Sequence, residues 1–384
     1  MHAWELILQF LQDMRARKLR TALALFGIAW GTISVILLLA VGDTFHRVSS
    51  KAMHGMGSGI AIVWPSRTTK AYAGMQPGRR LALKCEDVIR LGQDVPEVGL
   101  CSPEVTHWNR TVSFGDHRVK APVSGVVPEY EVMRNMIAAP GGRFLDPLDV
   151  RHRRRVAFIG DEVRRKLFAE EEPVGRTVLV DGRPFAVVGT LCEKVQSSSY
   201  NTADADQVFI PYSTFTAMWG DWNVNNFLVT PAVGHDSKPM IRALYEYLGR
   251  RYRFDPEDEG ALSIWDTLEV DRFLTFFFWG LKALFALSGA LTLGAGGIGV
   301  ANVMFLIVRE RTREIGVRMA VGARDGHILA QVLLEALLIV ALGGLGGFVA
   351  SALVIGLCGL LPLPGWLGRP ELSPPVALAT IGVL

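Results

Sequence analysis

Residues 309–324 read RERTREIGVRMAVGAR, a short charged segment between two long apolar runs. As a helix, it would place four apolar or small residues on one side, at offsets of four, seven and eight from the first: Ile315, Met319, Gly322 and Ala323. Glu314 precedes Arg318 by four residues, the favourable order for a helical ion pair. The pattern predicts a small helix suited to pressing on a protein at a membrane surface, and an ordinary solvated loop is the alternative.

The runs around this segment indicate a membrane protein. Four windows contain no Asp, Glu, Lys or Arg: 21–42, 283–308, 336–368 and 372–384. The first three exceed the roughly 20 residues that a helix needs to cross about 30 Å of hydrocarbon. The fourth is shorter and has a proline pair near its start, at 374–375, which suits the first turn of a helix, so we interpret it as the start of a fourth span. Half of all residues are apolar and the net charge is only +3, which argues against a nucleic-acid-binding protein.

Positive charge predicts the orientation of the spans. Arg15, Arg17, Lys18 and Arg20 precede the first span, and five arginines follow the second within 309–324. Positively charged flanks favour the cytoplasmic side, so the region between these two spans would lie across the membrane. The first apolar run is longer than the core of a cleaved signal peptide, which favours an uncleaved anchor.

These observations predict an α-helical membrane protein with four transmembrane helices, the fourth incomplete, and a large α+β extracytoplasmic domain between helices 1 and 2. The expected parts are an amphipathic cytoplasmic-surface helix (1–20), the first span (21–42), the extracytoplasmic domain with stalk helices at its ends (43–273), stalk and second span (274–308), the coupling segment (309–335), the third span (336–361), an external loop (362–373) and the start of the fourth span (374–384).

The extracytoplasmic region shows short β-type runs and amphipathic stretches. We expect strands at 59–64, 98–105, 155–159, 177–180, 185–191, 208–210 and 227–229, and helices at 84–93, 161–170 and 238–251. Asp181-Gly182 predicts a tight hairpin between two strands. The length of the whole extracytoplasmic region predicts two lobes, the second at about 105–207.

No catalytic or metal-binding pattern stands out in the sequence. It contains no HExxH, GxSxG or paired-cysteine motif, and no GxxxxGK[ST] phosphate loop. Asp204 and Asp206 are interpreted as part of a solvated turn rather than a cation site. Cys85, Cys101 and Cys192 would face the oxidising side, where at most one disulfide could form among them.

Small and polar residues within the spans predict helix packing. The candidates are Gly27, Gly31, Gly294, Gly299, Asn302, Gly343 and Gly347. Residues 294–299 formally match GxGxxG, but a dinucleotide site needs a preceding strand, so we assign these glycines to helix contacts.

The motif EIGVRMAVGA at 314–323 resembles the MacB and FtsX-like group of ABC transporter permeases. Further stretches are similar to that family: GIAWGTISVILLLAVGDTF (27–45), GRFLDPLDVRHRRRVAFIGDEV (142–163) and EPVGRTVLVDGRPFAVVG (172–189). The resemblance covers nearly the whole chain. It implies a permease of the bacterial inner membrane that is no enzyme itself and works as a dimer with a second copy or a paralogue.

The resemblance also implies how such a permease is driven. A separate cytoplasmic ABC ATPase, carrying ATP and Mg, would pass its conformational change through the helices to the periplasmic domain. The ATPase contact would fall on Glu314, Ile315, Gly316, Arg318, Met319, Ala320, Gly322 and Ala323. Export or efflux of a periplasmic substrate is the leading expectation, with a periplasmic adaptor and an outer-membrane channel as further partners and membrane lipid as the surroundings. Lipoprotein extraction, regulation of a cell-wall hydrolase and a plain membrane anchor are the alternatives.

Overall fold

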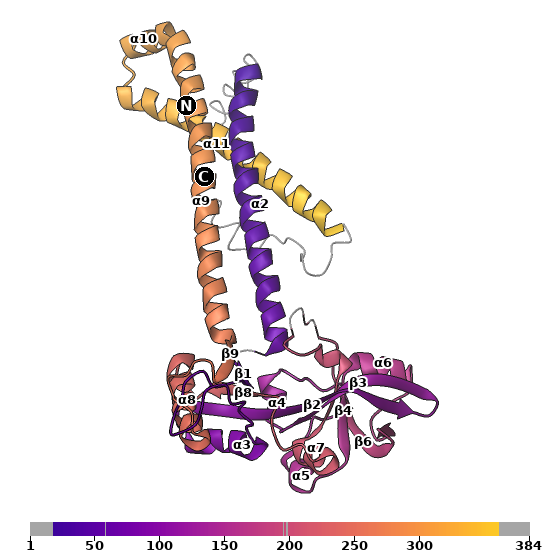
Figure 1. The fold of residues 1–384 in the computed structure, drawn as a ribbon. Coiled ribbons are helices and arrows are strands. Elements are labelled where there is room, and N and C mark those ends of the chain that lie inside the picture. The colour runs from indigo at the N-terminus through magenta and orange to yellow at the C-terminus, as the bar shows by residue number, and fades with distance from the viewer. Residues whose placement is uncertain (1–17, 58, 195, 197–198, 361–384) are drawn as a thin grey trace. The chain divides into compact units, whose positions relative to one another are not determined.

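A computed structural model describes residues 18–57, 59–194, 196 and 199–360 of the chain (Figure 1). They form two compact units, one made of residues up to 48 together with those from 275 onward, and the other of residues 49–274. The predicted helix at 1–20 falls almost wholly outside the described residues. The predicted external loop at 362–373 and the start of a fourth span at 374–384 lie entirely outside them.

Three of the described helices are long and apolar enough to cross a membrane. They are α2 (Lys18–Met56), α9 (Thr267–Glu310) and α11 (Asp325–Leu360), with 39, 44 and 36 residues. The short helix α10 (Thr312–Ala320) connects α9 to α11. Because α11 begins at Asp325, the last part of the predicted coupling segment belongs to this long helix.

Glycines allow α2 to approach both α9 and α11 closely. An added Cβ at Gly27 would lie 3.7 Å from the Cα of Gly296 on α9. At Gly343 it would lie 2.9 Å from the Cβ of Ile28, and at Gly347 it would lie 2.7 Å from a backbone oxygen of α2. Gly31 also lies at the contact between α2 and α9. Small residues at these positions let the helix backbones pack directly against one another.

The other predicted packing residues lie on an open side of α9. An added Cβ at Gly294 or Gly299 would meet nothing within 4 Å among the described residues, and Asn302 is exposed. Their role in helix packing therefore stays a prediction. The contact with Gly27 is made by Gly296, one of the GxGxxG glycines that the sequence analysis assigned to helix contacts, and that assignment is confirmed for Gly296.

Replacing Gly347 by valine is expected to loosen α11 from α2. The new side chain would meet backbone atoms of α2, which cannot move aside as a flexible side chain can, and overpacking of this kind costs about 1–3 kcal/mol. The midpoint of thermal unfolding in detergent should fall. Gly346→Val is the matched control, because an added Cβ there meets nothing within 4 Å in the described part of the chain. An equal loss in both variants would contradict this packing.

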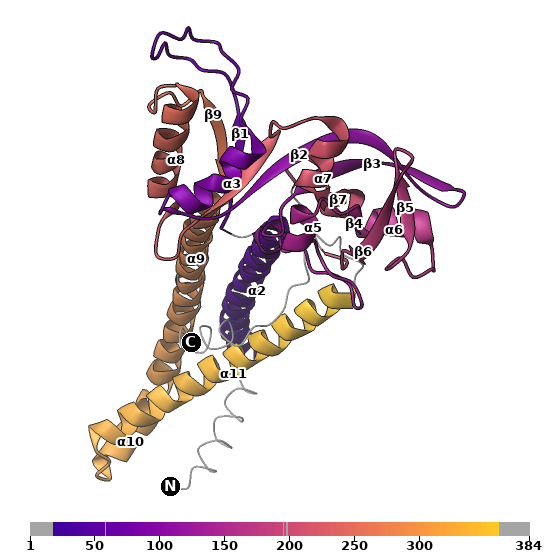
Figure 2. The ribbon, with the colours of Figure 1, turned by 90° about the horizontal axis from the view of Figure 1, so that it is seen from below.

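The second unit is built on nine strands in the order β3-β7-β4-β6-β5-β2-β8-β1-β9 (Figures 1 and 2). The strands are β1 (Ala61–Pro65), β2 (Val98–Phe114), β3 (His117–Val126), β4 (Val156–Ile159), β5 (Thr177–Val180), β6 (Arg183–Thr190), β7 (Val208–Pro211), β8 (Asn226–Pro231) and β9 (Leu262–Asp266). The helices are α3 (Cys85–Asp94), α4 (Tyr130–Met133), α5 (Pro147–Arg151), α6 (Asp161–Phe168), α7 (Tyr212–Trp219) and α8 (Ser237–Tyr252), with a 3-10 turn η1 (Asp204–Asp206).

Strand β2 connects the two parts of this sheet. Its first half pairs antiparallel with β8, up to Glu104 opposite Asn226, and its second half pairs with β3, from Val105 opposite Gly125. The residues of both parts cluster as one compact unit. The division of this region into two lobes therefore stays a prediction.

The predicted strands and helices are present, with some differences in length. The Asp181-Gly182 hairpin is confirmed, since Val180 pairs with Arg183 and both turn residues have positive φ, at 47° and 77°. Strand β2 runs on to Phe114, well beyond the predicted end at 105. Strands β3 and β9 and helices α4, α5 and α7 were not predicted. In β3 apolar residues do alternate at 119, 121 and 123, but a proline at 122 and a glycine at 125 weaken the signal of a strand.

Candidate functional site

The coupling segment folds as a short helix between two long ones. α9 ends at Glu310, α10 covers Thr312–Ala320, and α11 begins at Asp325. Gly322 has a φ of +99°, a backbone conformation that glycine adopts without strain, and it ends the helical path. The interpretation of 309–324 as one helix with Ile315, Met319, Gly322 and Ala323 on a shared face is therefore wrong.

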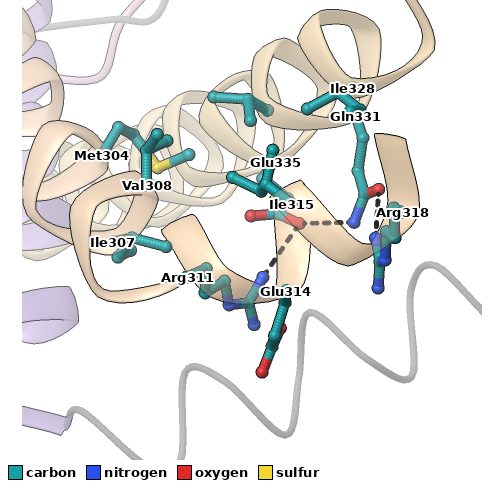
Figure 3. Close-up of a pocket in the computed structure, with 11 residues that line it drawn as sticks. Met304, Ile307, Val308, Arg311, Glu314, Ile315, Arg318, Ile328, Gln331 and Glu335 are labelled. Atoms are coloured by element: carbon teal, nitrogen blue, oxygen red, sulfur yellow. Dashed lines mark hydrogen bonds and ion pairs between the residues drawn. The ribbon is translucent and has the colours of Figure 1, made fainter. Parts of the chain in front are cut away.

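A chain of polar contacts holds α10 against α11 (Figure 3). Arg318 donates to the side-chain oxygen of Gln331 at 3.0 Å, and the amide nitrogen of Gln331 donates to Glu335 at 3.3 Å. A nitrogen of the Arg311 side chain lies 3.7 Å from the same Glu335 oxygen. Arg318 thus contacts Gln331 instead of forming the predicted ion pair with Glu314. The sequence analysis counted Arg311 only among the positive charges that set the orientation and did not consider Gln331 or Glu335, although Glu335 is the last charge before the apolar run at 336–368.

Apolar side chains of the segment divide into an inward and an outward set. Ile315 is half-buried and lines a small cavity of about 30 Å³ between α9, α10 and α11 (Figure 3). Val317 and Val321 point outward and are 60% and 84% exposed. Both line an open groove of about 860 Å³ between α10 and the first turns of α11, here called the α10 groove. Its other lining residues are Arg318, Gly322, Ala323, His327, Ile328, Ala330, Gln331 and Leu334.

The predicted coupling residues therefore lie in three settings. Ile315 packs inward, Arg318 and the turn residues Gly322 and Ala323 border the α10 groove, and the others are exposed on α10: Glu314, Gly316, Met319 and Ala320. The exposed valines that form the apolar part of the groove were not on the predicted list. Which of these residues contact a partner stays a prediction.

A cluster of charged side chains is buried in the sheet unit. Arg134 and Asp204 are 1% and 0% exposed, and their side chains meet at 2.6 Å. The Lys194 ammonium lies 2.6 Å from the other Asp204 oxygen, and Arg134 stacks over the ring of Tyr200 at 4.7 Å. We call Glu104, Arg134, Lys194 and Asp204 the buried charge cluster. The interpretation of Asp204 as part of a solvated turn is wrong, because tertiary contacts bury it.

Glu104 completes this cluster from strand β2. One of its oxygens accepts hydrogen bonds from the Tyr200 hydroxyl and the Asn226 amide, both at 2.6 Å. Burial raises the pKa of Glu104 above its ordinary value of 4.5, although those two hydrogen bonds and the charge of Arg134 partly oppose the rise. The folded protein therefore holds a proton here more tightly than the unfolded chain does.

The raised pKa of Glu104 should make the stability of the protein depend on pH. A raised pKa gives a contribution that is complete below about pH 4.5 and is lost as the pH rises through the folded-state value. Relative to Glu104→Gln, the parent protein is expected to lose stability with rising pH, by at most about 1.4 kcal/mol per pH unit. Urea unfolding, followed by tryptophan fluorescence between pH 4.5 and 8, measures this difference. Glu257→Gln is the surface control, and a pH-independent difference for Glu104→Gln would contradict the expectation.

Two family models match the chain at the places where these features lie. The MacB-like periplasmic core domain matches residues 21–245, which is more than half of the chain and contains the buried charge cluster. The FtsX-like permease C-terminal model matches residues 286–383, which contain α10 and the α10 groove. The chain belongs to the MacB-like and FtsX-like permease family. The family expected from residues 314–323 is thereby confirmed, and with it a membrane protein whose large domain is of the periplasmic type.

Curated relatives in this family are named as export proteins. The chain is 34% identical to the pyoverdine export ATP-binding/permease protein PvdT of Pseudomonas aeruginosa, over 89% of this chain and 50% of that protein. It is 32% identical to the macrolide export ATP-binding/permease protein MacB of Escherichia coli K12, over 92% of this chain and 53% of that protein. The chain thus spans about half the length of the curated relatives it matches. The two matched segments are both permease segments, and neither is an ATPase domain.

Among solved structures, the periplasmic region of MacB from Actinobacillus actinomycetemcomitans is similar at 17% identity and a TM-score of 0.46, covering 58% of this chain and 95% of that chain. Membership of the family rests on the sequence matches. Within the described residues of this permease, no group of three or more His, Cys, Asp or Glu side chains is placed to hold a metal ion.

Proposed function

We propose that this chain is the permease part of an ABC exporter and that it passes an ATP-driven change of shape to its extracytoplasmic domain. A separate cytoplasmic ATPase would bind ATP and Mg, and the chain would work in the bacterial inner membrane as a dimer. Export or efflux of a periplasmic substrate follows from the names of the relatives, which are exporters of two different cargoes.

The observation that carries the proposal is the build of α10 and its surroundings. α10 is a short helix between two membrane-length helices, and its outward side presents Val317 and Val321 above a groove with a polar border. Exposed apolar side chains ringed by polar ones are typical of a protein contact. The arginines around α10 favour the cytoplasmic side, where an ATPase would lie.

The inward contacts of α10 support a mechanical role. The polar chain from Arg318 through Gln331 to Glu335 ties the helix to α11, while Arg311 ties the end of α9 to the same carboxylate. A force on α10 would therefore reach two long helices rather than being absorbed by a loose loop. α9 is also linked to α2, since Lys282 lies 3.2 Å from Asp43. Such a connected set of helices is suited to move as a two-state element.

Affinity purification of the intact chain from membranes, in detergent, tests the proposal. We expect an ABC ATPase to co-purify, and ATP hydrolysis by that complex to require the permease. A periplasmic adaptor in the same complex would support export, and a lipoprotein carrier or a cell-wall hydrolase would favour the respective alternative. Recovery of the chain in intact form without any ATPase would contradict the proposal.

A further inference from the structure

Strand β9 is an open edge of the nine-stranded sheet. In the described part of the chain it ends the strand order and pairs with β1 alone, from Asp266 opposite Ala61 to Leu262 opposite Pro65. An edge strand offers unpaired backbone groups to any further strand, and proteins usually cover or block such an edge. The strand is short, at five residues, so a partner strand would pair with only a few of them.

The register decides which backbone groups face outward. The Thr267 amide donates to the carbonyl of Ile60 at 3.1 Å, and the Ser66 amide donates to the carbonyl of Ala261 at 3.0 Å. Both bonds fit the same antiparallel register. Since residues facing the partner strand alternate in such a pair, 261, 263, 265 and 267 face β1. The N–H and C=O groups of Leu262, Ile264 and Asp266 therefore point away from β1, and among them the Leu262 carbonyl already accepts a hydrogen bond from the Tyr245 hydroxyl.

Helix α8 forms a wall beside this edge. The Tyr245 hydroxyl, on α8, contacts the carbonyl oxygens of Leu262 at 3.0 Å and Glu259 at 3.2 Å. Between α8, β9 and the start of α9 lies an open groove of about 860 Å³, here called the β9 groove. Both views show α8 and β9 side by side (Figures 1 and 2). Apolar side chains from both elements line it: Ile241, Tyr245, Leu262 and Ile264.

The two ends of the groove differ in charge. α8 runs opposite to β9, because Asp236 before its first turn pairs with Arg272 on α9, whereas Tyr245 lies at Leu262. The end near α9 therefore carries Lys238, Arg242 and Glu269, with a net charge of one positive. The opposite end carries Lys70, Glu257 and Glu259, with a net charge of one negative. Lys70 is placed there by its bond to the Glu257 carbonyl at 2.8 Å.

We propose that the β9 groove binds the β9 groove of a second copy of this chain, so that two sheets join through antiparallel β9 strands. A two-fold axis through Ile264 sets Leu262 of one copy opposite Asp266 of the other. The outward N–H and C=O groups of the two Ile264 residues bond to each other. The positive end of each groove then meets the negative end of its partner, so the surface is complementary to itself, as an isologous interface requires.

This interface rests on the proposed function for the presence of a dimer, and it adds where the extracytoplasmic domains meet. An extended segment of another protein would also pair with a free strand edge. The opposed charges at the two ends favour the second copy, because reversal of the strand direction brings Lys238 and Arg242 toward Glu257 and Glu259.

A disulfide test reports the strand pairing directly. Facing residues of a hydrogen-bonded antiparallel pair have Cα atoms about 5.5 Å apart, within the range of a disulfide. Ile264→Cys is introduced into the full chain with Cys192→Ser and Cys358→Ser, and the protein is oxidised in membranes. We expect a covalent dimer on non-reducing gels. Leu179→Cys, an exposed position on β5, is the matched control and should form no covalent dimer on the same gels. Ile264→Cys linking no faster than this control overturns the interface.

A charge reversal tests the complementarity without touching the strand. Lys238→Glu with Arg242→Glu should slow the Ile264→Cys linkage by about tenfold, and further addition of Glu257→Lys and Glu259→Lys should restore it. An unchanged rate in the first variant, or no recovery in the second, would contradict the pairing of the two ends. The ATPase co-purification described above is measured on the same membranes. If the ATPase co-purifies but Ile264→Cys forms no covalent dimer, only the proposed interface is wrong. If the parent chain does not bind an ATPase, the proposed function is wrong.

Discussion

Replacing Arg134 by methionine is expected to lower the free energy of unfolding by about 3–5 kcal/mol. Its guanidinium is fully buried and meets Asp204 at 2.6 Å, so the change would leave a buried carboxylate with Lys194 as its remaining cation. The loss of stacking on Tyr200 adds to this cost. Urea unfolding of the purified protein, followed by tryptophan fluorescence, measures the effect.

The matched control for this change is Arg176→Met. Arg176 is more than half exposed and lies 3.9 Å from Glu171, an ion pair at the surface that contributes at most about 1 kcal/mol. A triple variant, Arg134→Met with Lys194→Met and Asp204→Asn, removes the central carboxylate together with both cations that contact it and should recover part of the loss. Similar stabilities for Arg134→Met and Arg176→Met would show that the buried charge cluster does not hold this unit together.

Replacing Val317 by aspartate is expected to reduce co-purification of the ATPase by about tenfold or more. Val317 is 60% exposed on α10 and lines the α10 groove, so a charge there would enter an apolar contact without a partner. Its outward direction means that the fold of the permease should not suffer. The amount of ATPase bound per permease and the rate of ATP hydrolysis are the two measurements.

Val233→Asp is the control for this second change. Val233 is fully exposed in the sheet unit, outside the coupling segment, so the same substitution there should leave ATPase binding unchanged. Val317 is also a better probe than Gly322, because a side chain at Gly322 would strain the positive-φ turn in addition to changing the surface. Normal ATPase binding by Val317→Asp would remove the α10 groove as the contact.

The surroundings of α10 show where sequence patterns mislead. A helical period continues on paper through Gly322, but the backbone turns there, and Ile315 and Met319 end up in different environments. The glycine and the following Asp325 are ordinary signals for the end of one helix and the start of another, and they could have been recognised. The link from Arg311 through Glu335 to Arg318 joins residues up to 24 positions apart, which no local pattern reveals.

The sheet unit shows the same difference between local patterns and contacts from distant segments. The Asp181-Gly182 hairpin was predictable because both turn residues adopt positive φ, a local property of the two residue types. Asp204 was misread because its burial depends on Arg134 and Lys194, which lie in other segments of the chain. Strand β9 was not predicted because it has only five residues and lies between a loop and a long helix.

The sequence by itself determined the membrane class, the large domain between the first two long helices, and the family, through uncharged windows and the motif at 314–323. These properties depend on hydrophobic length and on residues close together in the chain. Only the tertiary structure decided which glycines touch, which valines of the coupling segment are exposed, that Asp204 is buried, and that β9 is the last strand of the sheet in the described part of the chain. Each of these depends on contacts between segments that are distant in the chain, so no single stretch of sequence determines the free energy of those contacts.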